Sequence, residues 1–159
     1  MLLVVVDKIK KWILEFLDKP QKNLNDWSPC PYAKTALVND KIEFIYNNDL
    51  KSAVKQNIHI LEQKDVLVIC FDKETINPTE LVSLVSDLNK ELMKENIVVL
   101  EDHPDTVEMV NGVTMNFGEA GLLLVQNLDK LTDASDKLHK AGYYDCWSKD
   151  ELDEVVNWR

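Results

Sequence analysis

The stretch 25–34 holds the residues best suited to chemistry, because it places one thiol, that of Cys30, between Pro29 and Pro31. The two proline rings restrict the backbone on both sides of the sulfur. Pro31 also suits the first position of a helix, and a helix N-terminus together with the ammonium group of Lys34 lowers the pKa of a nearby thiol. The spacing therefore predicts a positioned nucleophile, since the thiolate is the reactive form.

A second polar loop follows a predicted strand and contains His103 and Asp105. Ligand sites of open α/β sheets lie in loops of this kind, at the carboxyl ends of strands. We expect His103 to act as the general base for Cys30, with Asp105 orienting the imidazole. Asp102 and Glu108 would complete a set of hard metal ligands, but a second His or Cys at ligand spacing is missing. We therefore assign no metal, and the cofactor is left unknown.

The predicted ligand contacts beside the thiol are Trp27, Tyr32 and Lys34. Trp27 lies in a polar loop, where a fully exposed indole would be unfavourable. Either it packs over the Cys30 loop and closes one wall of a pocket containing His103, or it anchors the loop to the N-terminal helix. Both arrangements bury the same ring.

These residues also have a structural interpretation. Most free cysteines are small buried hydrophobic residues, and a His-Pro turn flanked by surface acids requires no function. The chain has three cysteines, an odd count without a C-x-x-C pair. This usage is typical of a reducing compartment, so we expect a cytoplasmic protein with free thiols.

The Cys-Pro-Tyr-Ala-Lys motif at 30–34 and the His-Pro-Asp motif at 103–105 together resemble an uncharacterised bacterial domain family. Members of that family carry Cys-Pro-Phe-Ala-Lys after an N-terminal helix and His-Pro-Asp after a central strand. This chain has Tyr32 in place of the usual Phe, and it lacks the Arg-bearing segment that follows in the family. The resemblance implies that the Cys, Lys, His and Asp side chains of the two motifs face one pocket, and it implies no particular reaction.

The charge of the chain is acidic and uneven. The net charge is −10, and residues 101–159 contribute −8 of it with 13 acidic and 5 basic residues. Such a surface repels phosphate backbones and anionic lipid headgroups, so we expect neither a nucleic-acid nor a membrane partner. The one arginine, Arg159, is the last residue, which leaves no guanidinium group inside the domain for bidentate recognition of phosphate.

Hydrophobic periodicity and capping signals locate the secondary structure. An Asn-Pro-Thr-Glu start at 77–80 and a Ser-x-x-Glu box at 148–151 mark two helix N-termini. The predicted helices span 4–18, 31–38, 50–62, 78–94, 128–140 and 148–158, and the predicted strands span 41–46, 65–71, 96–100, 113–117 and 122–126.

The arrangement of these elements predicts an α/β (α+β) fold. Two apolar, β-rich runs at 66–71 and 97–100 each follow a helix of 13 or more residues, which favours parallel right-handed crossovers. Residues 41–101 should therefore form β-α-β-α-β with three parallel strands, within a mixed sheet of about five to six strands covered by helices. We find no repeat or linker, so residues 1–159 are predicted to form a single globular domain.

Two functions fit these observations. The first is a small cytoplasmic thiol-dependent enzyme or small-molecule-binding protein that uses a pocket formed by Cys30 and His103, with an unspecified reaction. The alternative is a non-catalytic acidic interaction protein that docks a basic partner through its C-terminal third. The two differ in whether Cys30, Lys34 and His103 converge in one concave pocket.

Overall fold

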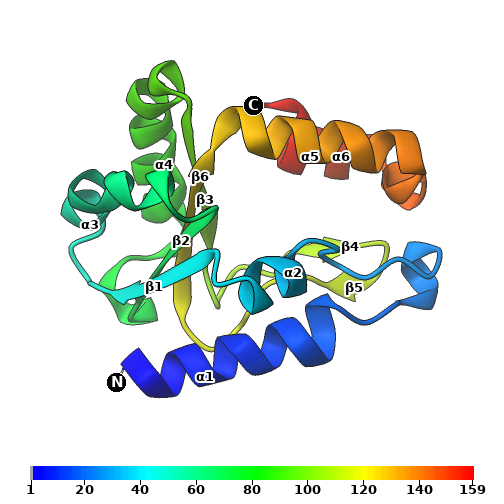
Figure 1. The fold of residues 1–159 in the computed structure, drawn as a ribbon, viewed down its shortest axis with the longest axis horizontal. Coiled ribbons are helices and arrows are strands. Elements are labelled where there is room, and N and C mark those ends of the chain that lie inside the picture. The colour runs from blue at the N-terminus through cyan, green and yellow to red at the C-terminus, as the bar shows by residue number, and fades with distance from the viewer. Residues whose placement is uncertain (1) are drawn as a thin grey trace.

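The structure is a computed structural model that describes residues 2–159, and its centre is a four-stranded mixed sheet. The strand order is β1-β2-β6-β3, with β1 parallel to β2 and with β6 antiparallel to both β2 and β3. A separate two-stranded antiparallel ribbon, β4-β5, lies away from the sheet (Figure 1). The strands are β1 (Ile42–Tyr46), β2 (Val66–Phe71), β3 (Ile97–Asp102), β4 (Met109–Val110), β5 (Val113–Thr114) and β6 (Gly121–Asn127).

The helices follow the predicted order. The longest, α4, starts where its sequence signals it, because Asn77 accepts a hydrogen bond from the Glu80 N–H at 2.9 Å and Pro78 occupies the first position. Short 3-10 turns lie at Lys22–Leu24, Ile58–Glu62, Lys73–Thr75, Met93–Glu95 and Tyr143–Cys146. The helices are α1 (Leu2–Trp12), continued by a π-helical turn at Ile13–Leu17, α2 (Ala33–Val38), α3 (Leu50–Asn57), α4 (Pro78–Leu92), α5 (Leu128–Ala141) and α6 (Lys149–Leu152), continued by a second π-helical turn at Asp153–Asn157.

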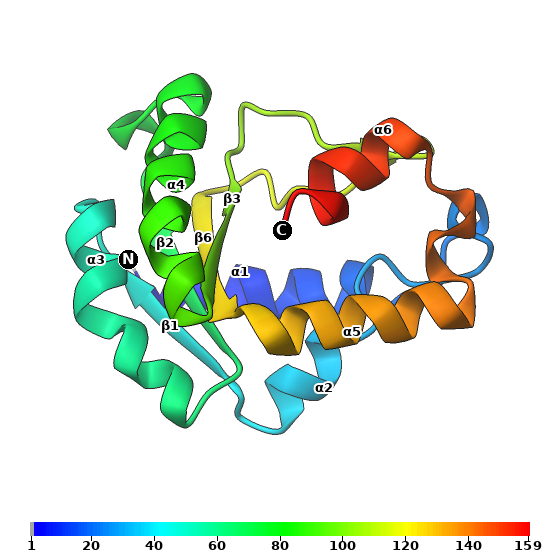
Figure 2. The same ribbon diagram turned by 90° about the horizontal axis from the view of Figure 1, so that it is seen from above.

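Helices cover both faces of the sheet. On one face, α3 and α4 pack against β2, β3 and β6 and form the larger hydrophobic core. On the other face, α1 packs against β2 and β6 through Ile9, Ile13 and Leu17 (Figures 1 and 2). Within residues 2–159, no helix has both the length and the apolar character required to cross a membrane.

The sheet confirms the predicted mixed α+β class but differs in the order of its strands. β1, β2 and β3 all point the same way, as expected, yet β6 lies between β2 and β3, so only β1 and β2 form a parallel pair. β6 contains the run Gly121-Leu-Leu-Leu-Val, which is apolar on both faces and suits a central position. The main sheet therefore has four strands rather than five or six, and the predicted strand at 113–117 is limited to β5.

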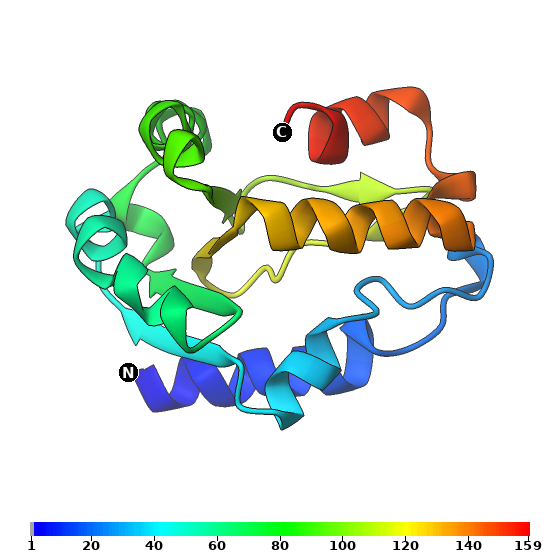
Figure 3. The same ribbon diagram turned by 45° about the horizontal axis from the view of Figure 1, so that its top comes forward.

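The junction between β6 and α5 directs the chain away from the sheet. Asn127 ends β6 and Leu128 begins α5, with no connecting loop. Asn96 holds the start of the helix, because its carbonyl accepts from the Leu128 N–H and its side chain accepts from the Asp129 N–H, both at 2.9 Å. As a result α5 extends away from the sheet instead of packing along it (Figures 2 and 3).

The outer edge of β3 is closed at its centre by a buried side chain from α4. Asn89 is 6 % exposed, and its Nδ2 group donates to the Val99 carbonyl at 2.9 Å. The Val99 N–H donates to the Asn89 Oδ1 at 2.8 Å. The side-chain amide thus takes the place of a neighbouring strand and blocks strand addition at this point.

Replacing Asn89 by Ala should lower the free energy of unfolding by about 2–4 kcal/mol, because two buried backbone groups of Val99 lose their partners. Urea unfolding measures this loss. The control is Lys90→Ala at the neighbouring exposed position, which should change stability by less than about 0.5 kcal/mol. Equal losses in the two variants would show that Val99 does not depend on the amide.

Candidate functional site

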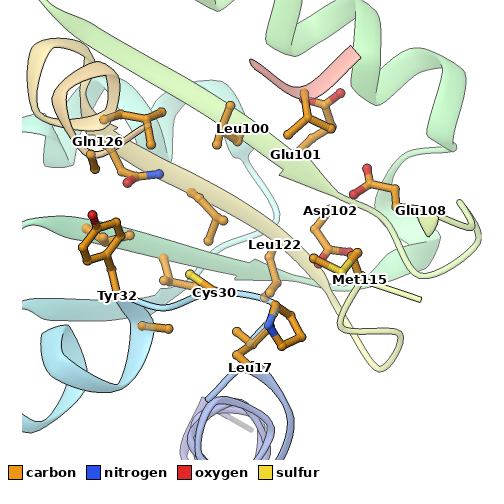
Figure 4. Close-up of a pocket in the computed structure, with 18 of the residues that line it drawn as sticks. Leu17, Cys30, Tyr32, Leu100, Glu101, Asp102, Glu108, Met115, Leu122 and Gln126 are labelled. Atoms are coloured by element: carbon orange, nitrogen blue, oxygen red, sulfur yellow. The ribbon is translucent and has the colours of Figure 1, made fainter. Parts of the chain in front are cut away.

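A cavity of about 1370 Å³ lies on the α1 side of the sheet, between the sheet and the C-terminal half of the chain. Its walls come from α1 and its π-helical turn, from the Cys30 loop and α2, from the four strands of the sheet, from α4 and α5, from the ribbon and from the C-terminal helical segment. Most of the lining side chains are aliphatic or aromatic (Figure 4). The apolar character is that of a ligand-binding site, and the volume exceeds the roughly 300–1,000 Å³ of most small-molecule pockets.

The cavity exists because α1 covers only part of this face. Val68 and Leu122 are buried beneath α1, whereas Val66, Leu100 and Leu124 farther along the sheet are only partly buried. All five residues line the cavity. A central strand such as β6 is normally covered on both faces, and α5 would be the element to cover it. Because α5 leaves the sheet, this apolar surface is left open.

One end of the cavity contains a buried carboxylate with a free oxygen. Asp102, the last residue of β3, is 7 % exposed, and its Oδ2 accepts a hydrogen bond from the Phe117 N–H at 2.9 Å. Its Oδ1 is buried and has no hydrogen-bond partner. Burial raises the pKa of Asp102 to about 6, although the Phe117 N–H opposes the rise. An unpaired buried acceptor of this kind is unfavourable unless a ligand supplies a donor.

Two further carboxylates lie at the same end, as Figure 4 shows for Glu101, Asp102 and Glu108. Burial, together with the negative charges of Asp102, Glu101 and Glu154, raises the pKa of Glu108 to about 7. Burial also raises the pKa of Glu101, and Glu154 adds to this rise. Glu101, Asp102 and Glu108 therefore lie together in a partly buried region, and the exposed Glu154 adds a nearby negative charge.

Three lysines also line the cavity, but each is engaged elsewhere. Lys90 pairs with Asp87 at 3.3 Å and Lys130 pairs with Asp65 at 3.6 Å. Lys41 donates to the Gln63 carbonyl at 3.4 Å. No ion pair among residues 2–159 involves the carboxylates at the acidic end, which are those of Glu101, Asp102, Glu108 and Glu154.

Cys30 lies in the cavity wall near the start of α2, at the end of the cavity away from Glu101 (Figure 4). Its N–H donates to the Leu17 carbonyl at 3.0 Å, which ties the loop to α1. Burial raises the pKa of the thiol, while the backbone N–H groups of Tyr32 and Ala33 act in the opposite direction. The predicted helix N-terminus is present, but desolvation outweighs it and keeps the neutral thiol.

His103 has a structural environment and does not line the cavity. The ring is 2 % exposed, and its Nε2 lies 2.8 Å from the Ile76 carbonyl and 3.2 Å from that of Lys73. Its Nδ1 accepts from the Asp105 N–H at 3.0 Å. This pattern requires a neutral ring protonated at Nε2, and it fastens the loop after β2 to the end of β3. The imidazole is not paired with Cys30.

The two other charged residues predicted for the site form ion pairs away from the cavity. Asp105 is exposed and pairs with Lys73 at 3.4 Å, so it contacts the His103 ring only through its backbone. Lys34 is exposed and pairs with Asp18 at 3.3 Å. Of the two sequence motifs, only Cys30 and Tyr32 contribute side chains that were expected at the site and line the cavity.

Trp27 takes a position that neither sequence alternative described. Its ring packs edge-on against Tyr143, with centroids 5.5 Å apart, in an aromatic cluster from the C-terminal part of the chain. The Tyr143 hydroxyl donates to the Pro29 carbonyl. Trp27 and Tyr143 thus attach the Cys30 loop to the turn after α5, and Tyr143 also lines the cavity.

Sequence reasoning missed the acidic end of the cavity and the aromatic wall opposite it. Asp102 and Glu108 were considered only as metal ligands, and no group of three or more His, Cys, Asp or Glu residues within 2–159 could hold a metal ion. The aromatic wall includes Tyr144 and Trp147, and the indole Nε1 of Trp147 is buried without a partner. The signal available was the concentration of aromatic residues within the acidic C-terminal third.

Comparison of the chain with protein-family models, curated proteins and solved structures found no match in any of the three.

Alkylation of Cys30 should be slow at neutral pH and should accelerate only above the ordinary thiol pKa of 9.0, because burial favours the neutral thiol. His103→Ala should leave this profile unchanged, since the ring is held by two distant carbonyls. Mass mapping of iodoacetamide adducts in a Cys146→Ser background measures the rate at one thiol. An inflection near neutral pH that disappears in His103→Ala would instead establish a thiolate-imidazole pair.

The free energy of unfolding should decrease as pH rises from about 4 to about 7, because the folded chain binds the Asp102 proton more tightly than the unfolded chain. Asp102→Asn should reduce this decrease by on the order of 2 kcal/mol, since the amide oxygen can still accept from Phe117. Urea unfolding across this pH range tests the difference. Asp136→Asn, an exposed carboxylate on α5 outside the cavity, is the matched control and should follow wild type.

Proposed function

We propose that this protein binds an apolar small molecule in the cavity beside Cys30. The observation that carries the proposal is the cavity itself, a hydrophobic space of about 1370 Å³ with an unpaired, buried carboxylate oxygen at one end. Apolar walls supply affinity, and a few buried polar groups orient a ligand.

The exposed hydrophobic residues in the cavity lining support the proposal. Of the ten large hydrophobic residues that are exposed among residues 2–159, six line the cavity. Clustered exposure of this kind marks a binding surface, whereas single exposed hydrophobic residues are ordinary. The six are Tyr32, Val82, Val107, Met109, Val155 and Trp158.

The depth of the cavity favours a small molecule over a protein surface. The lining reaches Leu17 and Leu122, which are buried behind the Cys30 loop. A flat interface with a basic protein partner would not use these inner walls. Within the proposal Cys30 and Tyr32 make ligand contacts, and no base is assigned to the thiol, because His103 is engaged elsewhere.

A cytoplasmic location is part of the same proposal. Cys30, Cys70 and Cys146 are all free thiols in the structure. Unpaired cysteines are most common in reducing compartments.

Filling the cavity should abolish binding of a neutral apolar probe such as N-phenyl-1-naphthylamine. Ala134 lines the cavity from α5, so Ala134→Trp should weaken probe binding by at least about ten-fold. Fluorescence titration measures the affinity. Ala141→Trp places the same ring at an exposed position of the same helix outside the cavity and should bind as wild type does. Equal binding by both variants, or none by wild type, would contradict the proposed function.

A further inference from the structure

We infer that the ligand is a cationic amphiphile, an apolar chain ending in an amine, whose ammonium group is bound by the carboxylates of Glu101, Asp102 and Glu108. This inference rests on the proposed function and names the class of ligand that the cavity takes. It depends on the unpaired oxygen of Asp102, on the lack of any ion pair to this carboxylate within residues 2–159, and on the apolar walls that continue from it.

Asp102 provides the primary contact. More than nine-tenths of the residue is buried, and the residue lies in the wall of the cavity. One of its oxygens accepts from the Phe117 N–H, and the other is buried there without a donor. A buried carboxylate is stable when a charged donor reaches it. An ammonium group supplies three N–H donors and the opposite charge.

The surroundings of Asp102 select a cation rather than an anion. Glu101 is its neighbour on β3, Glu108 lies in the following loop, and Glu154 approaches from the C-terminal helical segment. The remaining titratable neighbour, His103, accepts the Asp105 N–H at Nδ1, and a ring that accepts at this nitrogen is uncharged. An anionic headgroup at this end would meet like charges in a medium of low polarity, where repulsion is strong.

The lysines of the cavity do not neutralise this end. Each is paired with Asp87, Asp65 or the Gln63 carbonyl, and none forms an ion pair with the acidic group. The acidic end is therefore a binding site for an external positive charge. Separate carboxylates that do not converge in the manner of a metal site suit a larger organic ammonium group better than a bare divalent ion.

Apolar side chains begin directly beside the carboxylates. Figure 4 shows Leu100, Met115 and Leu122 around the acidic end, and the lining continues toward Leu17 and Cys30. An amine bound at Asp102 would therefore direct an attached alkyl chain into the cavity. This geometry distinguishes an amphiphilic amine from a small hydrophilic cation such as an alkanediamine.

Binding of such a ligand should depend on pH. An ammonium group favours the ionised form of Asp102 and Glu108, whose pKa values in the free protein are about 6 and about 7. Binding near neutral pH should therefore release protons, and affinity should increase as pH rises through this range, while the amine stays charged.

The test compares decylamine, decanol and decanoic acid, which share one alkyl chain and differ in their head groups. At neutral pH and physiological salt, decylamine should bind at least about ten-fold more tightly than the other two. Isothermal titration calorimetry in two buffers of different ionisation enthalpy should detect proton release with decylamine alone. Physiological salt screens the long-range attraction between decylamine and the net negative charge of the protein, so the comparison reports binding at the cavity.

The variants locate the selectivity. Asp102→Asn combined with Glu108→Gln should reduce the preference for decylamine over decanol to less than about three-fold, because decylamine binding weakens more than decanol binding. If the double variant does not fold, Glu108→Gln alone replaces it in the test, because Glu108 is a loop residue. This single variant should weaken the binding of decylamine but not that of decanol. The matched controls are Asp136→Asn and Glu74→Gln, two exposed carboxylates outside the cavity, which should behave as wild type does.

The outcomes separate the inference from the proposed function. Equal binding of decylamine and decanol by wild type, or loss of the preference in the control variants, overturns the cationic ligand but leaves an apolar cavity that binds. Failure of decanol, decylamine and the neutral fluorescent probe to bind overturns both.

Discussion

The structure depends on how β6 ends. The strand occupies the centre of the sheet, pairs with β2 and β3, and passes into α5 at Asn127 and Leu128 without a loop. Asn96 fixes the direction of the helix by accepting two N–H groups from its first turn. Had α5 folded back over β6, the α1 side of the sheet would be an ordinary closed core. Because it points away, the same apolar residues line a cavity, and the ribbon, the Cys30 loop and α6 are assembled around it.

Local signals in the sequence were sufficient for most elements and insufficient for their arrangement. The caps at Asn77 and Ser148 act at short range, and both helices begin where these residues predict. The position of β6 depends on pairing with strands that lie far away in sequence, which periodicity does not encode. The rule for parallel crossovers correctly gave the common direction of β1, β2 and β3, but it could not exclude a strand inserted later between two of them.

The candidate site shows a similar division. The prolines around Cys30 predicted a positioned sulfur at a helix start, and the structure places it there, in a cavity wall. The pKa of the Cys30 thiol is raised rather than lowered because the thiol is buried. This burial arises from α1, α5 and the C-terminal residues, so the sequence around Cys30 does not indicate it. For His103, the sequence indicated a polar loop at the end of a strand. It did not indicate that both ring nitrogens would form hydrogen bonds with backbone groups. Asp102, one residue earlier, is the group with an unused oxygen.

The insertion of β6 also has a consequence for the order of folding. α4 and β3 are close in sequence and are joined through Asn89, so we expect them to associate early, as β1, α3 and β2 do. Until β6 arrives, one edge of β2 and one edge of β3 remain unpaired, and both strands are strongly apolar. Partly folded chains therefore expose two unpaired strand edges that are buried in the native protein. Copies of the chain at this stage can pair through these edges and aggregate.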